Sequence, residues 1–145
     1  HAAEGRPMRI RRASESFLRE NAEFAGAYLP EILESYKSFA DFLKHGFAFF
    51  ALEGENICGN IISNGEYNGC CIAGADTKAE YRRRGIASAL LRTAIESARE
   101  RGNEIIWECA EENIPSVRTA ESCGMHRCGE FFVRWFEFEP NTPQD

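Results

Sequence analysis

The stretch that decides the fold is residues 77–91, TKAEYRRRGIASALL. An expected strand ends here, a turn with three arginines and a glycine follows, and a long helix begins at once. The first backbone N–H groups of a helix have no partner within it, and the helix dipole adds partial positive charge at that end. Gly85 has no Cβ that would obstruct a ligand, and Ala87 has the smallest one. This turn is therefore suited to hold a phosphate or pyrophosphate.

The side chains around the turn fit an anion site. Arg82, Arg83 and Arg84 bring positive charge, and Ser88 adds a hydroxyl. Local composition fits equally well a solvated run of charges with Gly85 as an ordinary turn residue. Neither Gly-x-x-x-x-Gly-Lys-Ser/Thr nor Gly-x-Gly-x-x-Gly occurs in the sequence, which argues against a Walker loop and a dinucleotide fingerprint.

Length and charge exclude several classes of function. A chain of 145 residues fits one domain with one sizeable core. Its 43% hydrophobic and 28% charged residues are typical of a globular chain rather than a disordered one. The net charge of −6 argues against general nucleic-acid binding, which relies on excess Lys and Arg. The longest apolar runs, 47–52 and 89–91, are far shorter than a membrane span. We expect neither nucleic acid nor membrane as a partner.

The six cysteines include no Cys-x-x-Cys pair. Residues 1–7, HAAEGRP, have no apolar segment and do not resemble a secretory signal. Cys123, His126 and Cys128 lie close together, but a zinc site would need a fourth ligand. We therefore expect reduced, mostly buried thiols in a cytoplasmic protein, and no metal.

The pattern along the chain predicts one domain at 8–139, with 1–7 as a cloning remnant or linker and 140–145 as a polar tail. Strands are expected at 8–13, 47–53, 57–63, 70–75, 104–110 and 131–138. Helices are expected from Ser14 towards Phe24, over 31–44, over 85–101 and over 113–122. Asn64-Gly65 is expected to break the third strand. This order predicts an α/β (α+β) fold with a mixed, mainly antiparallel central sheet flanked by helices.

Two motifs lie in register on these elements. Residues 82–87, Arg-Arg-Arg-Gly-Ile-Ala, fit the pattern Arg/Gln-x-x-Gly-x-Gly/Ala. Residues 113–125 contain Asn-x-x-Ser followed by Ala-Glu-x-x-Gly-Met, similar to an Asn-led helix that ends in Gly-Phe. Together they resemble the GNAT superfamily of N-acetyltransferases, and the order of elements over 8–138 agrees. Trp107-x-Cys109 is similar to a bacterial subgroup whose members often carry an additional N-terminal half.

The resemblance implies that acetyl-CoA is the co-substrate, bound in a V-shaped opening between the strand that ends near Thr77 and the strand 104–110. The strand backbone at Ala75, Asp76 and Thr77 would bind the pantetheine arm as an added strand would. The pyrophosphate would be held by the backbone amides of Arg83, Arg84, Gly85, Ile86 and Ala87, with Ser88. Asn113 and Ser116 would reach the pantetheine or its thiol end, although Asn113 can also serve simply as a helix cap.

The reaction that the resemblance implies is direct acetyl transfer to an amine, which must lose a proton before it attacks. Ala120 stands where many members have a tyrosine acid, and Cys71 stands where some have a glutamate base. Substitute bases are Asp76, Glu111 and Glu112, and Cys109 is a substitute acid. Each of the four also has a purely structural interpretation, and positioning of the two reactants alone can support the reaction.

Three functions stay open at this point. The leading one is an acetyl-CoA-dependent N-acetyltransferase. A non-catalytic acyl-CoA-binding or regulatory module of a longer protein is the second, and a structural or interaction domain that keeps only the fold is the third. The net negative charge of the chain favours a cationic amine as acceptor. The helix 31–44 would form one wall of the acceptor-binding site. A homodimer is an open alternative for the assembly.

Overall fold

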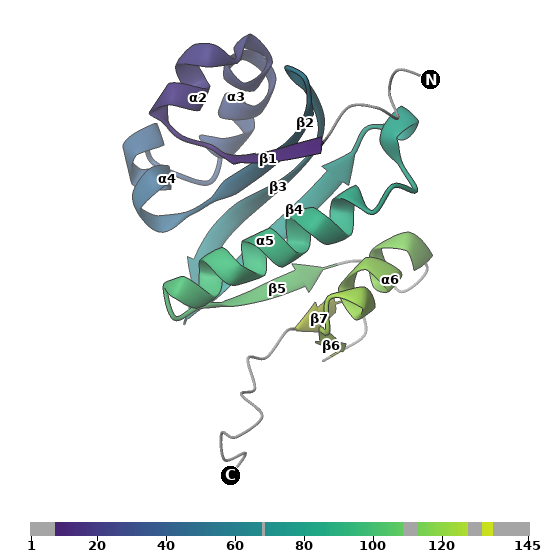
Figure 1. Ribbon diagram of the computed structural model, residues 1–145. Helices are drawn as coiled ribbons and strands as arrows, with labels where there is room; N and C mark the ends of the chain where they lie inside the picture. Colours follow the sequence, from purple (N-terminus) through teal and green to yellow (C-terminus); the bar gives the residue numbers. More distant parts are fainter. Residues whose placement is uncertain (1–7, 68, 109–112, 128–131, 135–145) are drawn as a thin grey trace.

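The computed structural model in Figure 1 describes residues 8–67, 69–108, 113–127 and 132–134. Its seven-stranded sheet has the order β1-β2-β3-β4-β5-β7-β6. The strands are β1 Met8–Arg12, β2 Ala48–Glu53, β3 Asn56–Tyr67, β4 Cys70–Thr77, β5 Glu104–Glu108, β6 His126–Arg127 and β7 Phe132–Arg134. The helices are α2 Glu15–Glu20, η1 Phe24–Tyr28, α3 Leu29–Ile32, α4 Phe39–His45, η2 Ala79–Tyr81, α5 Ile86–Glu100 and α6 Ile114–Ser122.

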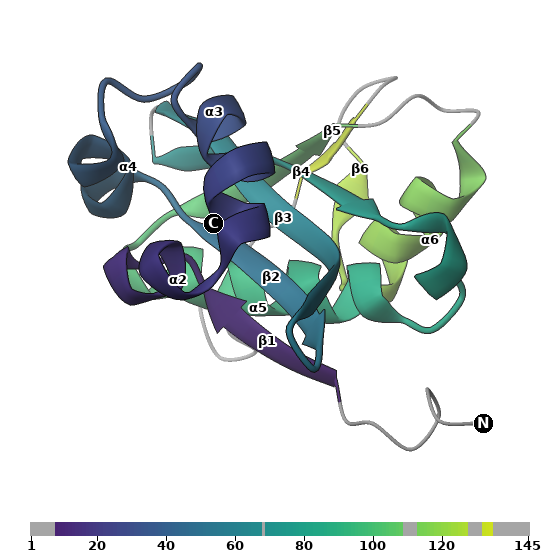
Figure 2. The same cartoon turned by 90° about the horizontal axis from the view of Figure 1, so that it is seen from above.

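The pairing of the strands confirms the predicted fold class. β4 and β5 are parallel neighbours, joined through α5, whereas the other neighbouring pairs in the described sheet are antiparallel. Figures 1 and 2 show α5 and α6 on one face of the sheet and the N-terminal helices α2, α3 and α4 on the other. None of the helices in the described ranges is long and apolar enough to cross a membrane.

Each face of the sheet has its own core. Successive side chains of a strand point to opposite faces, so β2 contributes to both. Phe49 and Ala51 join the core under α5, while Phe50 and Leu52 join the aromatic core under the N-terminal helices. α5 buries a stripe at the helical period, as the sequence predicts. That stripe is Ile86, Leu90, Leu91, Ala94, Ile95 and Ala98.

The single helix predicted over 31–44 is wrong. α3 ends at Ile32, and α4 begins only at Phe39. The apolar spacing continues across the gap, but Ser38 adopts an extended backbone and its hydroxyl accepts from the Asp41 N–H at 3.0 Å. A serine in this position starts a new helix instead of continuing an old one. Asn21 likewise ends α2 and accepts from the Phe24 N–H at 2.9 Å.

The prediction that Asn64-Gly65 breaks the third strand is also wrong. β3 runs on to Tyr67, and the register with β4 shifts between Ser63 and Gly65. Such a bulge absorbs an extra residue without ending the ladder. β4 is longer than predicted and reaches Thr77. β6 was not predicted. Residues 109–110, 131 and 135–138 of the predicted strands lie outside the described residues.

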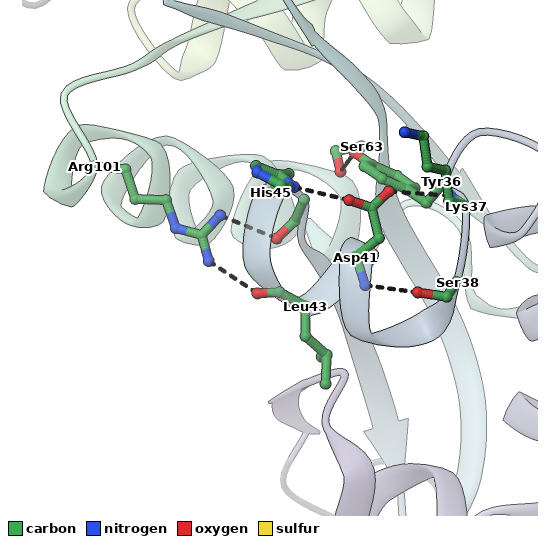
Figure 3. Close-up of polar contacts among 9 residues, drawn as sticks. Tyr36, Lys37, Ser38, Asp41, Leu43, His45, Ser63 and Arg101 are labelled. Carbon is green, nitrogen blue, oxygen red and sulfur yellow. Dashed lines mark hydrogen bonds and ion pairs between the residues drawn. The ribbon is translucent and has the colours of Figure 1, made fainter.

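The junction of α4 and β2 is tied to the rest of the fold by a polar cluster (Figure 3). The hydroxyls of Tyr36 and Ser63 lie 2.7 Å apart, and Ser63 Oγ also accepts from the Phe47 N–H at 2.9 Å. Arg101, at the end of α5, donates to the carbonyl of Gly46 at 3.2 Å and to that of Leu43 at 3.5 Å. These bonds satisfy carbonyls that the end of a helix leaves without partners.

Candidate functional site

A cavity of about 540 Å³ opens where β4 and β5 part. The parallel pairing of the two strands ends at Ala73 and Trp107, but β4 continues to Thr77. The N-terminus of α5 and the first turns of α6 contribute the remaining walls. The opening expected between these two strands is therefore present, and its volume falls within the range of small-molecule sites.

The structure brings most of the predicted binding residues together around this cavity. β4 contributes Ala75, Asp76 and Thr77, and α6 with its cap contributes Asn113 and Ser116. The turn and the first residues of α5 contribute Arg82, Arg83, Gly85, Ile86, Ala87 and Ser88. Arg84 does not line the cavity. Cys109, Glu111 and Glu112 lie outside the described residues.

Four further residues line the cavity that the sequence reasoning did not assign to the site. Tyr81 directly precedes the arginine motif and Trp107 belongs to the Trp-x-Cys pattern, so their place in the sequence could have assigned them to the site. Pro115 and Thr119 lie four residues apart on α6, on the helix face that Ser116 shares. The 3.6-residue period of the predicted helix would have found Thr119.

The start of α5 presents free backbone donors to the cavity. Gly85 is the N-cap residue, with φ of 77°, and no side chain among the described residues caps the helix. Its left-handed backbone is one that a glycine adopts at little cost. A Cβ at Gly85 would meet no atom within 4 Å, so the space beside it is open. The first N–H groups of α5 therefore remain available to an anion.

The arginine turn, residues 82–85, is held by bonds to two strands. Arg82 Nε donates to the Thr77 carbonyl on β4 at 3.0 Å. The Arg84 guanidinium lies 5.1 Å from the centre of the Tyr81 ring and 3.7 Å from Glu53 Oε2 at the end of β2. Arg83, between them, has a left-handed φ of 68°. Arg82 and Arg83 thus line the cavity, whereas Arg84 contacts Tyr81 and Glu53.

Glu53 is a buried carboxylate beneath this turn. It is 7% exposed, and the Tyr81 hydroxyl donates to its Oε1 at 3.2 Å. The pKa of Tyr81 rises to about 12, chiefly through the charge of Cys58 and a hydrogen bond with it, and also through Glu53. Burial raises the pKa of the Cys58 thiol. Tyr81 therefore stays a protonated donor at physiological pH.

Acidic groups gather at the rim beside β4. Asp76 is exposed, lines the cavity and pairs with Asn60 across the β3–β4 ladder. Burial raises the pKa of nearby Tyr28, and the charges of Glu23 and Asp76 raise it further. Lys78 neutralises Glu23 at 2.7 Å. Asp76 thus brings a carboxylate to the edge of the cavity.

The positions where the resembled superfamily has its acid and base are buried here. Ala120 is 0% exposed and Cys71 is 2% exposed, and both pack in the core under α5.

Trp107 is 4% exposed, and within the described structure its indole N–H has no acceptor. Ser88, which lines the cavity, also has its Oγ within hydrogen-bond distance of Ser122 Oγ on α6, at 3.0 Å. No group of three metal-ligating side chains occurs among the described residues.

Comparisons with known proteins agree with this geometry. A family model described as GNAT acetyltransferase matches residues 4–133. No curated protein matched the sequence. A GCN5-related N-acetyltransferase-like protein from Streptococcus suis aligns with a TM-score of 0.67 and 16% identity, over 91% of this chain and 49% of its own. This chain therefore spans about half the length of that protein.

Two other solved structures match over most of their length. A Bacillus subtilis acetyltransferase in complex with CoA aligns with a TM-score of 0.59 and 17% identity, covering 88% of this chain and 96% of that one. Spermidine N-acetyltransferase from Vibrio cholerae, in complex with CoA and spermine, aligns with a TM-score of 0.58 and 19% identity, covering 88% and 89%. These likenesses establish the shared fold.

Proposed function

This chain belongs to the GNAT acetyltransferase family, and on that basis we propose that it transfers an acetyl group from acetyl-CoA directly to an amine. The observation that carries the proposal is the cavity between β4 and β5, which meets the uncapped N-terminus of α5 and the arginine turn. One end of that cavity suits a phosphate-bearing group, and the other lies beside the part of β4 that extends beyond its last described pair with β5. This combination fits the pyrophosphate and the pantetheine arm of CoA.

The cavity offers three kinds of contact to CoA. Residues 74–77 of β4 pair with β3 on one side and lie beyond the last pair with β5 on the other. The Thr77 carbonyl accepts from Arg82 Nε, and the backbone groups of this segment that no described strand pairs suit the pantetheine amides. The first amides of α5 suit the pyrophosphate. Asn113 Oδ1 caps α6 by accepting from the Ser116 N–H at 3.3 Å, which leaves the Asn113 NH₂ group to donate to the ligand.

The acetyl transfer requires a neutral amine at the thioester carbonyl. The amine nitrogen attacks the carbonyl carbon, the C–S bond breaks, and the CoA thiolate leaves and takes up a proton. Asp76 lies at the cavity edge on the side of the N-terminal helices, where its carboxylate is suited to attract an ammonium group and accept its proton. A cationic amine is therefore the proposed acceptor class. Positioning of the two reactants supplies the remaining acceleration.

A non-catalytic acyl-CoA-binding module is the second candidate. It is favoured by the buried Ala120 and Cys71, because neither position supplies a proton donor or acceptor to the cavity. Such a module would bind CoA and acetyl-CoA but release no free thiol with any amine. A cytoplasmic location and a homodimer also remain proposals from the sequence.

The test combines binding and turnover. Titration calorimetry with CoA should show saturable binding, and a thiol-reactive dye should report free CoA when acetyl-CoA is mixed with a panel of polyamines, monoamines and amino acids. Absence of CoA binding by the folded protein would overturn the proposal. Binding without thiol release across the panel would favour the module.

Asp76→Asn tests the proposed base. We expect kcat to fall by about ten- to a hundredfold, with an unchanged Kd for CoA. Asp41→Asn, at a partly buried aspartate on α4 outside the cavity, is the matched control and should keep wild-type kcat. Cys109→Ala, Glu111→Gln and Glu112→Gln, measured in the same assay, test the three remaining candidates from the sequence. A wild-type kcat for Asp76→Asn would exclude Asp76 as the base.

A further inference from the structure

The three consecutive arginines of the turn have three different surroundings. Arg82 is bonded through Nε to the Thr77 carbonyl. Arg84 is turned away from the cavity, over the Tyr81 ring and towards Glu53. Arg83 lines the cavity, and in the described part of the chain no hydrogen bond or ion pair engages its side chain. Equal charge in the sequence therefore does not mean an equal role in the structure.

Glu53 explains why Arg84 is held on the inner side of the turn. No donor within the described residues forms a hydrogen bond with Glu53 Oε2, which is buried. A buried carboxylate requires a compensating charge, and the Arg84 guanidinium at 3.7 Å supplies it. The Tyr81 hydroxyl binds the other carboxylate oxygen and its ring lies beneath Arg84. Glu53, Tyr81 and Arg84 thus form a clamp that ties the turn to β2.

Arg83 occupies a backbone conformation that a non-glycine residue adopts only under strain. Its φ is 68°, and it stands between the two anchored arginines. A glycine at this position would relieve the strain, as Gly85 does two residues later. No hydrogen bond or ion pair of the Arg83 side chain within the described residues offsets that strain. A hydrogen bond or ion pair between the Arg83 side chain and a phosphate bound in the cavity would offset the backbone strain.

We propose that Arg82 and Arg84 are positioning residues that hold the turn, and that Arg83 makes the side-chain contact with the phosphates of CoA. The proposal rests on the proposed function, because it needs CoA in the cavity. It predicts that substitutions at different arginines of the turn change different properties, either the stability of the fold or the affinity for CoA. Loss of Arg83 costs affinity without stability, whereas loss of Arg84 costs stability first.

The experiment measures the melting temperature of the free protein and the Kd for CoA, by calorimetry, in matched variants. Arg83→Gly removes the charge and the strain together, Arg83→Ala removes the charge alone, and Arg83→Lys keeps the charge. Arg92→Ala removes one exposed positive charge from α5 outside the cavity and serves as the control. Arg84→Ala, and the double variant Glu53→Gln with Arg84→Ala, test the clamp.

We expect Arg83→Gly and Arg83→Ala to raise the Kd for CoA by about tenfold or more, because a charge-assisted hydrogen bond to phosphate is lost. Arg83→Lys should lose less, and Arg92→Ala should keep the wild-type Kd. The melting temperature of Arg83→Gly should not fall below that of the wild type. Arg84→Ala should melt several degrees lower, and the added Glu53→Gln should recover part of that loss because no buried charge is left unpaired.

Either of two results overturns the proposal while the proposed function stands. The first is a wild-type Kd for Arg83→Gly in a protein that binds CoA. The second is an Arg84→Ala variant that keeps the wild-type melting temperature. If the wild-type protein binds no CoA, the proposed function itself fails, and the two failures are told apart by that single titration.

Discussion

The α4 cluster and the arginine turn are both polar, but they differ in what they leave unpaired. The α4 cluster, made of Tyr36, Asp41, Gly46, Ser63 and Arg101, is closed. Its hydroxyls face each other, and Arg101 binds two helix-end carbonyls (Figure 3). Ser63 also accepts from the Phe47 N–H. The arginine turn is open: Arg83 has a left-handed backbone, and among the described residues no side chain caps α5 and no donor bonds to Glu53 Oε2.

The difference separates residues that stabilise the fold from residues that are prepared for a ligand. Buried polar groups in proteins are almost always hydrogen-bonded, so each exception calls for an explanation. In the α4 cluster the protein supplies the partners itself. At the turn, the partners of the free amides and of Arg83 are best supplied by an anion. Substitutions in the first region should therefore change stability, and substitutions in the second should change binding.

The largest effect should come from Gly85→Glu. The new carboxylate would lie in the open space beside the α5 amides and repel the pyrophosphate. We expect the affinity for CoA to fall by about a hundredfold or more, which corresponds to ~2.7 kcal/mol. Gly85→Ala carries the same backbone strain without the charge and is the control. Calorimetry on both variants, with circular dichroism to confirm folding, checks this, and wild-type affinity in Gly85→Glu would place the anion site elsewhere.

Gly46→Ala should produce the opposite pattern. A Cβ at Gly46 would collide with the Tyr36 hydroxyl and would lie 2.7 Å from Ser63 Oγ. We expect a loss of about 2 kcal/mol in the free energy of unfolding and a melting temperature lower by roughly 4–8 °C. The Kd for CoA should not change. Gly26→Ala, where a Cβ meets no atom within 4 Å, is the control. A change in Kd without a change in stability would contradict the comparison.

Ser63→Ala and Tyr36→Phe sharpen the comparison within the α4 cluster. Ser63→Ala leaves the buried Phe47 N–H without its acceptor, whereas Tyr36→Phe removes one hydroxyl from a pair. We expect Tyr36→Phe to cost about 1 kcal/mol and Ser63→Ala more than that. Urea unfolding of both single variants and of the double variant measures the coupling. Equal losses in the two single variants would show that the bond to Phe47 contributes nothing.

The smallest effect concerns Asp41 and pH. The bond from the Lys37 N–H lowers the pKa of Asp41, and the bond with His45 lowers it further. Because the folded pKa lies below the unfolded one, the stabilisation is present above about pH 4 and disappears as the pH falls through the folded pKa. Asp41→Asn should therefore melt slightly below the wild type at neutral pH, and the difference should vanish in acid. A difference that grows in acid would contradict the assigned bonds.

The parts of the fold that could be predicted from the sequence are those with local signals. α5 and α6 have apolar stripes, a glycine or asparagine at the start and a stop at the end, and both form near the predicted bounds. The helix predicted over 31–44 failed because periodicity cannot detect that Ser38 caps a new helix. The cavity residues on three elements were predictable because two motifs mark them.

The clamp under the arginine turn could not be predicted. Glu53 lies at the end of a strand far from Arg84 in the chain, and nothing in its local sequence marks a buried carboxylate. Without that partner, the three arginines are indistinguishable in a sequence. The contact with Glu53 on β2, which separates Arg84 from the two cavity-lining arginines, is a tertiary property.

Hydrogen exchange with and without CoA tests most directly the claim that the turn is prepared for a ligand and the α4 cluster is not. Mass spectrometry on the free and CoA-saturated protein follows amides in both regions at once. Bound CoA should slow exchange across residues 82–89 and leave residues 38–50 unchanged. Protection at 38–50, or none at 82–89 while calorimetry shows bound CoA, would contradict the account.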